Sequence, residues 1–376
     1  MAVPQAGPSL ASSVSSTQPK LPSSSHRLPT VSAFEALQDL QSHGSASELS
    51  GVRSLDNLLQ NGNASGDGGF ERGKVTEIWG PSGAGKTALL LQTAAKALMR
   101  GQNVVWVDGD TPLDGPRLKS VLEQNMASTD TPNSNLQQSL KRFHHRVVPA
   151  LSHLLAMIMH ARSSFPPEGT SLLVIDGLNT LIDLDYPRFP YASLSKTEQQ
   201  RWQTGRRYAV LGSFVSALNK LAVLNNLAAI VTTGCASRTR NDSGLGSALV
   251  PGVGGGEWDA GVWSRLAVFR DFSGRCVGLQ KCQGRSLISR EEIGEVGKVI
   301  KLVATKQGGL RERTTLKDVE QTPLKAISSP VKPRKRTYDE VADSDGEDAD
   351  EYGWADTDED ALAGGGPEEA AATEQE

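Results

Sequence analysis

The sequence predicts an α/β fold in which helices cover a mostly parallel sheet. Between residues 75 and 233, apolar runs of strand length alternate with segments of helical periodicity, which is typical of parallel sheets. A glycine-rich turn directly follows the first apolar run and opens the first helical segment. Three short apolar runs separated by turns come later in the chain, and they predict an antiparallel extension of the same sheet.

The spacing of apolar residues places the individual elements. The first strand is Val75 to Trp79, and apolar residues from Leu89 to Leu98 then recur at helical spacing until Gly101 ends the helix. The later elements are a strand at Asn103–Asp108, a helix near Leu151–Ala161, a strand at Leu172–Asp176, a helix within Ser193–Asn226 and a strand at Leu227–Thr233. The antiparallel extension comprises Arg265–Arg270, Arg275–Leu279 and Lys298–Ala304.

Composition divides the 376 residues into a core and two polar ends. Residues 1–45 are rich in Ser, Pro, Ala and Gln, so we expect a disordered leader before a folded core at residues 46–325. Val31, Phe34, Leu37 and Leu40 repeat every third position within that leader. They predict a short helix, which either lies on the core or docks a partner. Residues 326–376 form the polar C-terminal end.

The charge of the chain is unevenly distributed. Residues 339–376 contain 16 acidic and no basic side chains, and without them 27 acidic residues remain against 39 basic ones, a balance of +12. This balance favours a polyanionic partner. The basic run of Lys332, Arg334, Lys335 and Arg336 precedes the acidic tail. It predicts a nuclear-import signal, although ordinary disordered charge is the alternative.

The cysteines and the hydropathy pattern bear on the compartment. Cys235, Cys276 and Cys282 are odd in number and lack CxxC spacing, which suits neither a disulfide framework nor a zinc site. No secretory signal or bilayer-length apolar run is present in the sequence. We therefore expect a soluble intracellular protein in a reducing compartment, with no membrane partner, and the basic run at Lys332–Arg336 predicts that this compartment is the nucleus.

The strongest motif is a phosphate-binding loop. It fits the pattern GxxxxGK[ST], follows a strand and opens a helix. Its residues are Gly80, Pro81, Ser82, Gly83, Ala84, Gly85, Lys86 and Thr87. Glycines allow backbone N–H groups to surround phosphates, the lysine reaches the β- and γ-phosphates, and the threonine ligates magnesium. The motif predicts that ATP and Mg²⁺ bind here.

Three carboxylates end strands on the side of the sheet where the loop lies. Asp176 is expected to hold the water shell of magnesium beside Thr87, the alternative being a cap for the next helix. Asp108 and Asp110 follow another strand. Either one could orient or deprotonate an attacking water, or the pair could serve as turn and N-cap residues before Pro112.

A segment rich in Gly and Ser lies between Gly234 and Glu257 and carries Arg238 and Arg240. Since it follows a strand whose tip faces the expected nucleotide, we interpret it as a flexible loop that contacts a sugar-phosphate backbone. The alternative is a solvated surface loop.

Several segments together resemble the eukaryotic recombinase paralogues of the RecA superfamily, especially the fungal mediator ATPases of recombinational DNA repair. The resemblance covers roughly Gly51 to Gly309, and its last segment places Trp258 and Arg265 at matching positions. The segments are GVRSLDNLL, GKVTEIWGPSGAGKT, VVWVDGD, SLLVIDGLN and LVPGVGGGEWDAGVWSRLAVFR.

This resemblance implies a RecA-like P-loop ATPase core with ATP at Gly80 to Thr87 and a magnesium ligand at Asp176. It also implies single-stranded DNA contact by the segment that holds Arg238 and Arg240. The implied partners are a second recombinase paralogue, in a hetero-oligomer, and the main strand-exchange recombinase.

The sequence also departs from the recombinase pattern. No long helical DNA-binding domain precedes Gly51, the catalytic glutamate of the recombinases falls on the shorter Asp110, and their phosphate-sensing glutamine falls near Gly234. We therefore expect a recombination mediator with weak, DNA-dependent ATP turnover. The alternatives are an active DNA-stimulated ATPase that exchanges or translocates strands, and a small-molecule P-loop kinase, whose usual arginine-rich lid is not identified.

Overall fold

The computed structural model describes residues 32, 46–60, 68–127, 135–187, 198–239, 246–272, 274–289 and 293–313. The chain divides into two units, residues 1–44 and 45–376, and the elements described below belong to the second. The helix expected at Val31–Leu40, apart from Ser32, lies outside the described residues, as do the basic run at Lys332–Arg336 and the acidic tail.

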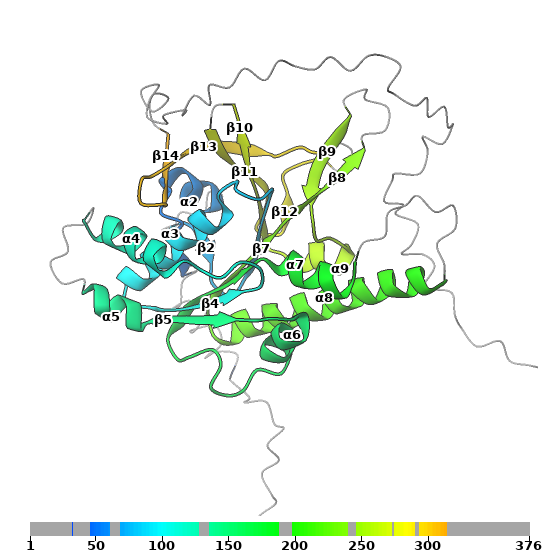
Figure 1. The fold of residues 1–376 in the computed structure, drawn as a ribbon, viewed down its shortest axis with the longest axis horizontal. Helices are drawn as coiled ribbons and strands as arrows, with labels where there is room; N and C mark the ends of the chain where they lie inside the picture. The colour runs from blue at the N-terminus through cyan, green and yellow to red at the C-terminus, as the bar shows by residue number, and fades with distance from the viewer. Residues whose placement is uncertain are drawn as a thin grey trace, which may run out of the picture. The chain divides into compact units, whose positions relative to one another are not determined.

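A mixed sheet of ten strands forms the centre of the described residues (Figure 1). Six strands pair in parallel in the order β10, β3, β7, β6, β4, β5. Their bounds are β3 Val75–Trp79, β4 Asn103–Asp108, β5 Phe143–Val147, β6 Thr170–Asp176, β7 Ala228–Thr233 and β10 Ser264–Asp271. The antiparallel strands are β11 Gly274–Cys282, β12 Arg285–Ser286, β13 Lys298–Ala304 and β14 Leu310–Glu312.

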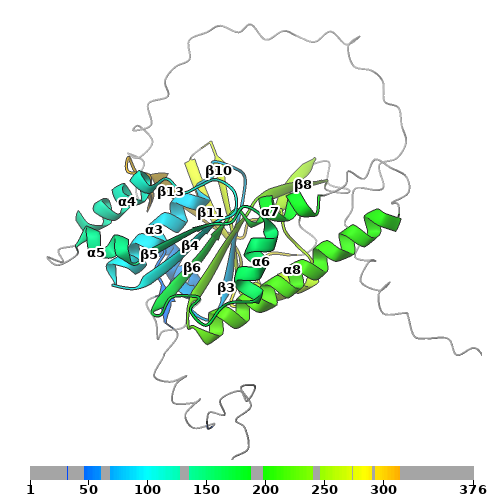
Figure 2. The same ribbon diagram turned by 60° about the horizontal axis from the view of Figure 1, so that its bottom comes forward.

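Helices cover both faces of the sheet. Figure 2 shows α3, α4 and α5 on one face and α6, α7 and α8 on the other. The helices are α2 Arg53–Gln60, α3 Lys86–Met99, α4 Gly115–Ala127, α5 Leu136–Lys141, α6 Leu151–Met159, α7 Leu178–Asp185, α8 Glu198–Leu224 and α9 Gly256–Gly261. None of these helices combines the length and apolar character needed to cross a membrane.

Alternation along the central strands separates two apolar cores. In β4, Val104 and Trp106 pack in the core with α3, whereas Val105 and Val107 pack in the core with α6 and α8. Successive side chains of a strand point to opposite faces, so a strand buried on both faces appears in the sequence as a continuous apolar run. Helix α8 contributes a stripe to the second core through Leu211, Phe214, Val215, Leu218, Leu221 and Ala222.

The expected doubly wound sheet with an antiparallel extension is confirmed. One detail differs, because β10 pairs in parallel with β3 and the antiparallel part begins with β11. Strand β5 and helices α4, α5 and α7 were not predicted. The sequence of β5, FHHRV, is polar and partly exposed, since this strand lies at the sheet edge and has no continuous apolar run.

The segment from Gly234 to Glu257 is not a loop throughout, so that prediction was wrong. Strands β8 (Cys235–Thr239) and β9 (Ser247–Pro251) pair as an antiparallel hairpin, and α9 follows at Gly256. Backbone hydrogen bonds hold this hairpin, and its strands show little apolar alternation. Residues 240–245, between the two strands, lie outside the described residues.

Candidate nucleotide-binding site

The glycine-rich turn joins the end of β3 to the start of α3. Gly80 has φ 149°, and a Cβ at this position would lie 1.9 Å from the Val268 carbonyl oxygen of β10. Gly85 has φ 122°, and a Cβ there would lie 3.2 Å from Cδ of Arg275. Both φ values favour glycine, and at Gly80 the backbone of the neighbouring strand β10 also leaves no room for a side chain.

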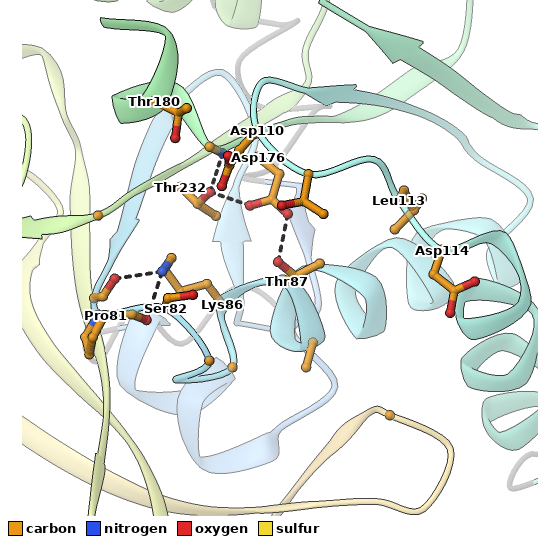
Figure 3. A pocket seen from close by; sticks show the side chains of 18 of the residues that line it. Pro81, Ser82, Lys86, Thr87, Asp110, Leu113, Asp114, Asp176, Thr180 and Thr232 are labelled. Atoms are coloured by element: carbon orange, nitrogen blue, oxygen red, sulfur yellow. Dashed lines mark hydrogen bonds between the residues drawn. The ribbon is translucent and has the colours of Figure 1, made fainter. Parts of the chain in front are cut away.

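Lys86 lies over the mouth of this turn. Its Nζ donates to the carbonyl oxygens of Gly80, at 2.7 Å, and Pro81, at 3.1 Å (Figure 3). Burial lowers the pKa of Lys86, and the nearby Asp176 carboxylate opposes that shift. The ammonium group is therefore partly desolvated and bonded to neutral acceptors, which phosphate oxygens can replace.

Thr87 and Asp176 meet at the carboxyl ends of the strands. The Thr87 hydroxyl donates to Oδ2 of Asp176 at 2.8 Å, and the Thr232 hydroxyl of β7 donates to Oδ1 (Figure 3). Thr232 in turn accepts a hydrogen bond from the Gly177 amide at 2.8 Å. Burial raises the pKa of Asp176 despite the two hydroxyl donors. No side chain caps helix α7, which follows at Leu178, so the alternative role of Asp176 as a helix cap is wrong. The contact with Thr87 shows that Asp176 faces the P-loop.

These donors suit a magnesium ion. Mg²⁺ prefers oxygen ligands and is usually bound through one or two protein side chains together with substrate phosphates. A threonine hydroxyl and a carboxylate already within hydrogen-bonding distance match that requirement. The residues present therefore fit a magnesium ion bound with a nucleotide.

The structure separates the two carboxylates that follow β4. Asp108 is buried, and its carboxylate accepts from Nε1 of Trp106 at 2.7 Å and from the Leu113 amide at 2.8 Å. Nε2 of His145 lies 2.5 Å from its Oδ2. Asp110 is exposed and lines the cleft beside the P-loop (Figure 3). The turn role thus fits Asp108, and only Asp110 faces the cleft.

The cleft has a volume of about 750 Å³, within the range of small-molecule sites. Its lining includes two arginines that the sequence did not predict as site residues, Arg117 of α4 and Arg275 of β11. Arg117 donates from Nη2 to the Gly308 carbonyl oxygen at 3.2 Å. Neither arginine belongs to a local motif, so the sequence contains no signal that would place either one here.

The β8–β9 hairpin begins at the rim of the cleft. Gly234 and Cys235 belong to the cleft lining, and the Gly252 amide donates to the Gly234 carbonyl oxygen at 3.0 Å. Arg238 lies opposite Ala248 in the hairpin. Among the described residues, its buried Nε has no hydrogen-bond partner. Arg240 lies outside the described residues.

A second polar group, the Glu77 network, involves residues that flank this hairpin in the sequence. Glu77 of β3 is fully buried and accepts from Thr233 Oγ1 at 2.8 Å, Trp258 Nε1 at 3.1 Å and Arg265 Nε at 2.7 Å. Arg265 also pairs with Asp259. Burial alone would lower the pKa of Arg265, but Glu77 and Asp259 outweigh it and raise the pKa. Thr233 precedes the hairpin and Trp258 follows it, so Glu77 joins its two ends.

Comparison with known proteins agrees with this architecture. The family model "RecA N-terminal domain" matches residues 41–128. The chain is 28% identical over 272 residues to DNA repair protein rhp55 of Schizosaccharomyces pombe, a match that covers 61% of this chain and 75% of that protein.

Two prokaryotic relatives match over shorter stretches. DNA repair and recombination protein RadB of Methanococcus maripaludis is 28% identical over 166 residues, covering 44% of this chain and 66% of that protein. Protein RecA of Nitratidesulfovibrio vulgaris is 47% identical over 51 residues, or 14% of each chain.

The sheet, the turn and the Thr87–Asp176 contact define a P-loop protein of the doubly wound α/β class. With the matches above, the chain contains a RecA-like domain, and the expected resemblance to the recombinase paralogues of the RecA superfamily is confirmed.

Proposed function

We propose that this chain binds ATP with Mg²⁺ in the P-loop cleft and acts in the nucleus as a mediator of homologous recombination. The observation that carries the proposal is the convergence of Lys86 and Thr87, from helix α3, and Asp176, from strand β6, on one cleft. The contact between Thr87 and Asp176 joins residues 89 positions apart in the sequence, so it reports the tertiary fold and is independent of the motif.

Each residue would have a distinct role with the nucleotide. Lys86 would exchange its two carbonyl acceptors for phosphate oxygens, and backbone amides from Gly83 to Thr87 would surround the phosphates. Thr87 and Asp176 would hold the magnesium ion, which neutralises phosphate charge when it is bound. Thr232 would keep the Asp176 carboxylate oriented toward Thr87.

The β8–β9 hairpin is the proposed contact with single-stranded DNA, through Arg238 and Arg240. Its base adjoins the cleft at Gly234 and Cys235, so nucleotide and DNA would bind at neighbouring positions. Two similar proteins are named for DNA repair or for DNA repair and recombination, which supports a role of this kind. The proposed protein partners are a second paralogue and the main strand-exchange recombinase, whose filament the complex would support.

One observation favours the alternative of an active DNA-stimulated ATPase. Asp110 is exposed in the cleft, where it could orient or deprotonate a water. Comparing ATP turnover with and without single-stranded DNA separates the two functions. A DNA-stimulated rate that Asp110→Asn abolishes would favour the ATPase, whereas negligible turnover with intact nucleotide binding favours the mediator.

The nucleotide site is tested by titrating a fluorescent ATP analogue with the full chain. Lys86→Ala is expected to weaken binding by about a hundredfold, because a partly buried charge-assisted contact to phosphate is lost. Lys119→Ala is the matched control, since Lys119 is an exposed lysine on α4 outside the cleft lining. Unchanged affinity in Lys86→Ala would contradict the proposed site.

A further inference from the structure

Arg275 of β11 lies directly against the P-loop. A Cβ built on Gly85 would lie 3.2 Å from Cδ and 3.4 Å from Nε of Arg275. The arginine also belongs to the cleft lining together with Lys86 and Thr87. Strand β11 thus brings a guanidinium group to the same turn of chain that leads into Lys86.

One nitrogen of this guanidinium lacks the hydrogen-bond partner that a buried donor normally has. Within the described residues, Nε of Arg275 is buried and has no hydrogen-bond partner. Buried polar atoms are nearly always satisfied, and exceptions call for an explanation such as a missing ligand. A buried donor at the edge of a phosphate-binding loop is the kind of group that an anion would satisfy.

The neighbouring arginines also favour an anionic ligand at this position. Arg270 of β10 lies directly opposite Arg275 in the antiparallel register, an arrangement that is unfavourable for like charges. Burial lowers the pKa of Arg275, and Arg270 and Arg117 lower it further. Positive charge is therefore concentrated beside the cleft at a cost to the stability of the ligand-free protein.

We propose that Arg275 is a nucleotide-binding residue that donates to the phosphate oxygens of the nucleotide at the P-loop. This inference rests on the proposed nucleotide site and adds a contact from the antiparallel part of the sheet. The bound phosphates satisfy Nε and offset the repulsion among the three arginines. Gly85 then has two roles, because it shapes the turn and leaves room for the arginine stem.

Arg275→Met tests this role, because methionine keeps an unbranched stem and removes the charge. We expect affinity for the fluorescent ATP analogue to fall about tenfold, as for the loss of a charge-assisted hydrogen bond. Inorganic tripolyphosphate should compete about tenfold less well than with the wild type, whereas adenosine should compete equally with both. Arg285→Met is the control and should bind like the wild type, because Arg285 is exposed on β12 and is not part of the cleft lining.

Thermal unfolding of the ligand-free protein separates a binding role from a structural one. Relief of like-charge repulsion should leave the melting temperature of Arg275→Met equal to or above that of the wild type. A lower melting temperature with unchanged ATP affinity would overturn the proposal. If Arg275→Met does not fold, Arg275→Lys decides: a loss of affinity supports the proposal and unchanged affinity overturns it.

Different results would refute the nucleotide site and the role of Arg275. A wild-type chain that binds neither ATP nor tripolyphosphate refutes the nucleotide site itself. A wild-type chain that binds both, with Arg275 variants that bind equally well, refutes only the role of Arg275.

Discussion

The Glu77 network and the P-loop cleft both contain buried or partly buried charged groups, but their partners differ. In the network, the Glu77 carboxylate has three donors, and the Arg265 guanidinium pairs with two carboxylates. In the cleft, Lys86 donates to the backbone carbonyl oxygens of Gly80 and Pro81, and within the described residues Nε of Arg275 has no hydrogen-bond partner.

This difference distinguishes charged groups that stabilise the fold from charged groups that are available to bind a ligand. A buried ion pair tolerates removal from water only when its remaining hydrogen bonds are satisfied, as they are around Glu77. Groups that stay under-satisfied in a cleft are candidates for function. The opposite pKa directions of Arg265 and Arg275, on neighbouring strands, express the same contrast.

The largest expected effect is on stability. Arg265→Met removes the cationic partner of a fully buried carboxylate and should lower the free energy of unfolding by about 3–5 kcal/mol. Urea unfolding of the full chain measures this change. Arg285→Met, at an exposed position on β12, should change stability by less than about 0.5 kcal/mol. If Arg265→Met lowered the free energy of unfolding as little as the control does, the Glu77 network would not stabilise the fold and would not differ from the cleft in this respect.

Replacing Asp176 should weaken ATP binding without lowering the stability of the fold, unlike the replacement of Arg265. Because burial raises the pKa of Asp176, the native state binds its proton more readily than the unfolded state does. The stability that this carboxyl contributes is therefore present below its unfolded pKa and is lost as pH rises through the raised pKa. Asp176→Asn should unfold at the same urea concentration as the wild type or higher, yet bind ATP about tenfold more weakly in Mg²⁺.

The same carboxyl predicts a pH dependence of binding. Magnesium requires the ionised form, so the Mg²⁺-dependent part of ATP affinity should decline as pH falls toward the raised pKa. Titrations that descend from about pH 8 toward the ordinary aspartate value of about 3.9 cover that window, because the pKa of Asp176 is raised above that value. The Asp176→Asn variant should show a weaker decline, and an identical profile in both proteins would exclude Asp176 as the titrating group.

The smallest expected effect concerns the hairpin. Arg238→Ala should weaken binding of a single-stranded oligonucleotide several-fold and reduce the slope of log affinity against log salt by about 0.7, as for one lost phosphate contact on a single strand. Arg285→Ala, at an exposed position on β12, is the control. Equal slopes for the two variants would place the DNA contact elsewhere.

The sequence predicted the parts of the fold and site that are local in the chain. The strand, turn and helix from Val75 to Met99 form one continuous pattern, and β6 appears as an apolar run that ends at Asp176. The residue pattern alone did not distinguish Asp108 from Asp110, because the path of the turn decides which carboxylate is buried; only the family resemblance singled out Asp110. Arg275 was also missed as a cleft residue, since only the register of β10 and β11 brings it to Gly85.

The central claim is that the turn from Gly80 to Thr87 encloses the phosphates of a nucleotide. The most direct test is a crystal structure of the full chain grown with magnesium and a non-hydrolysable ATP analogue. We expect the phosphates to lie against the backbone amides of Gly83 to Thr87, with Lys86 moved off its carbonyl acceptors and the metal beside Thr87 and Asp176. A nucleotide bound elsewhere, or a turn that retains the Lys86 contacts at saturating analogue, would contradict it.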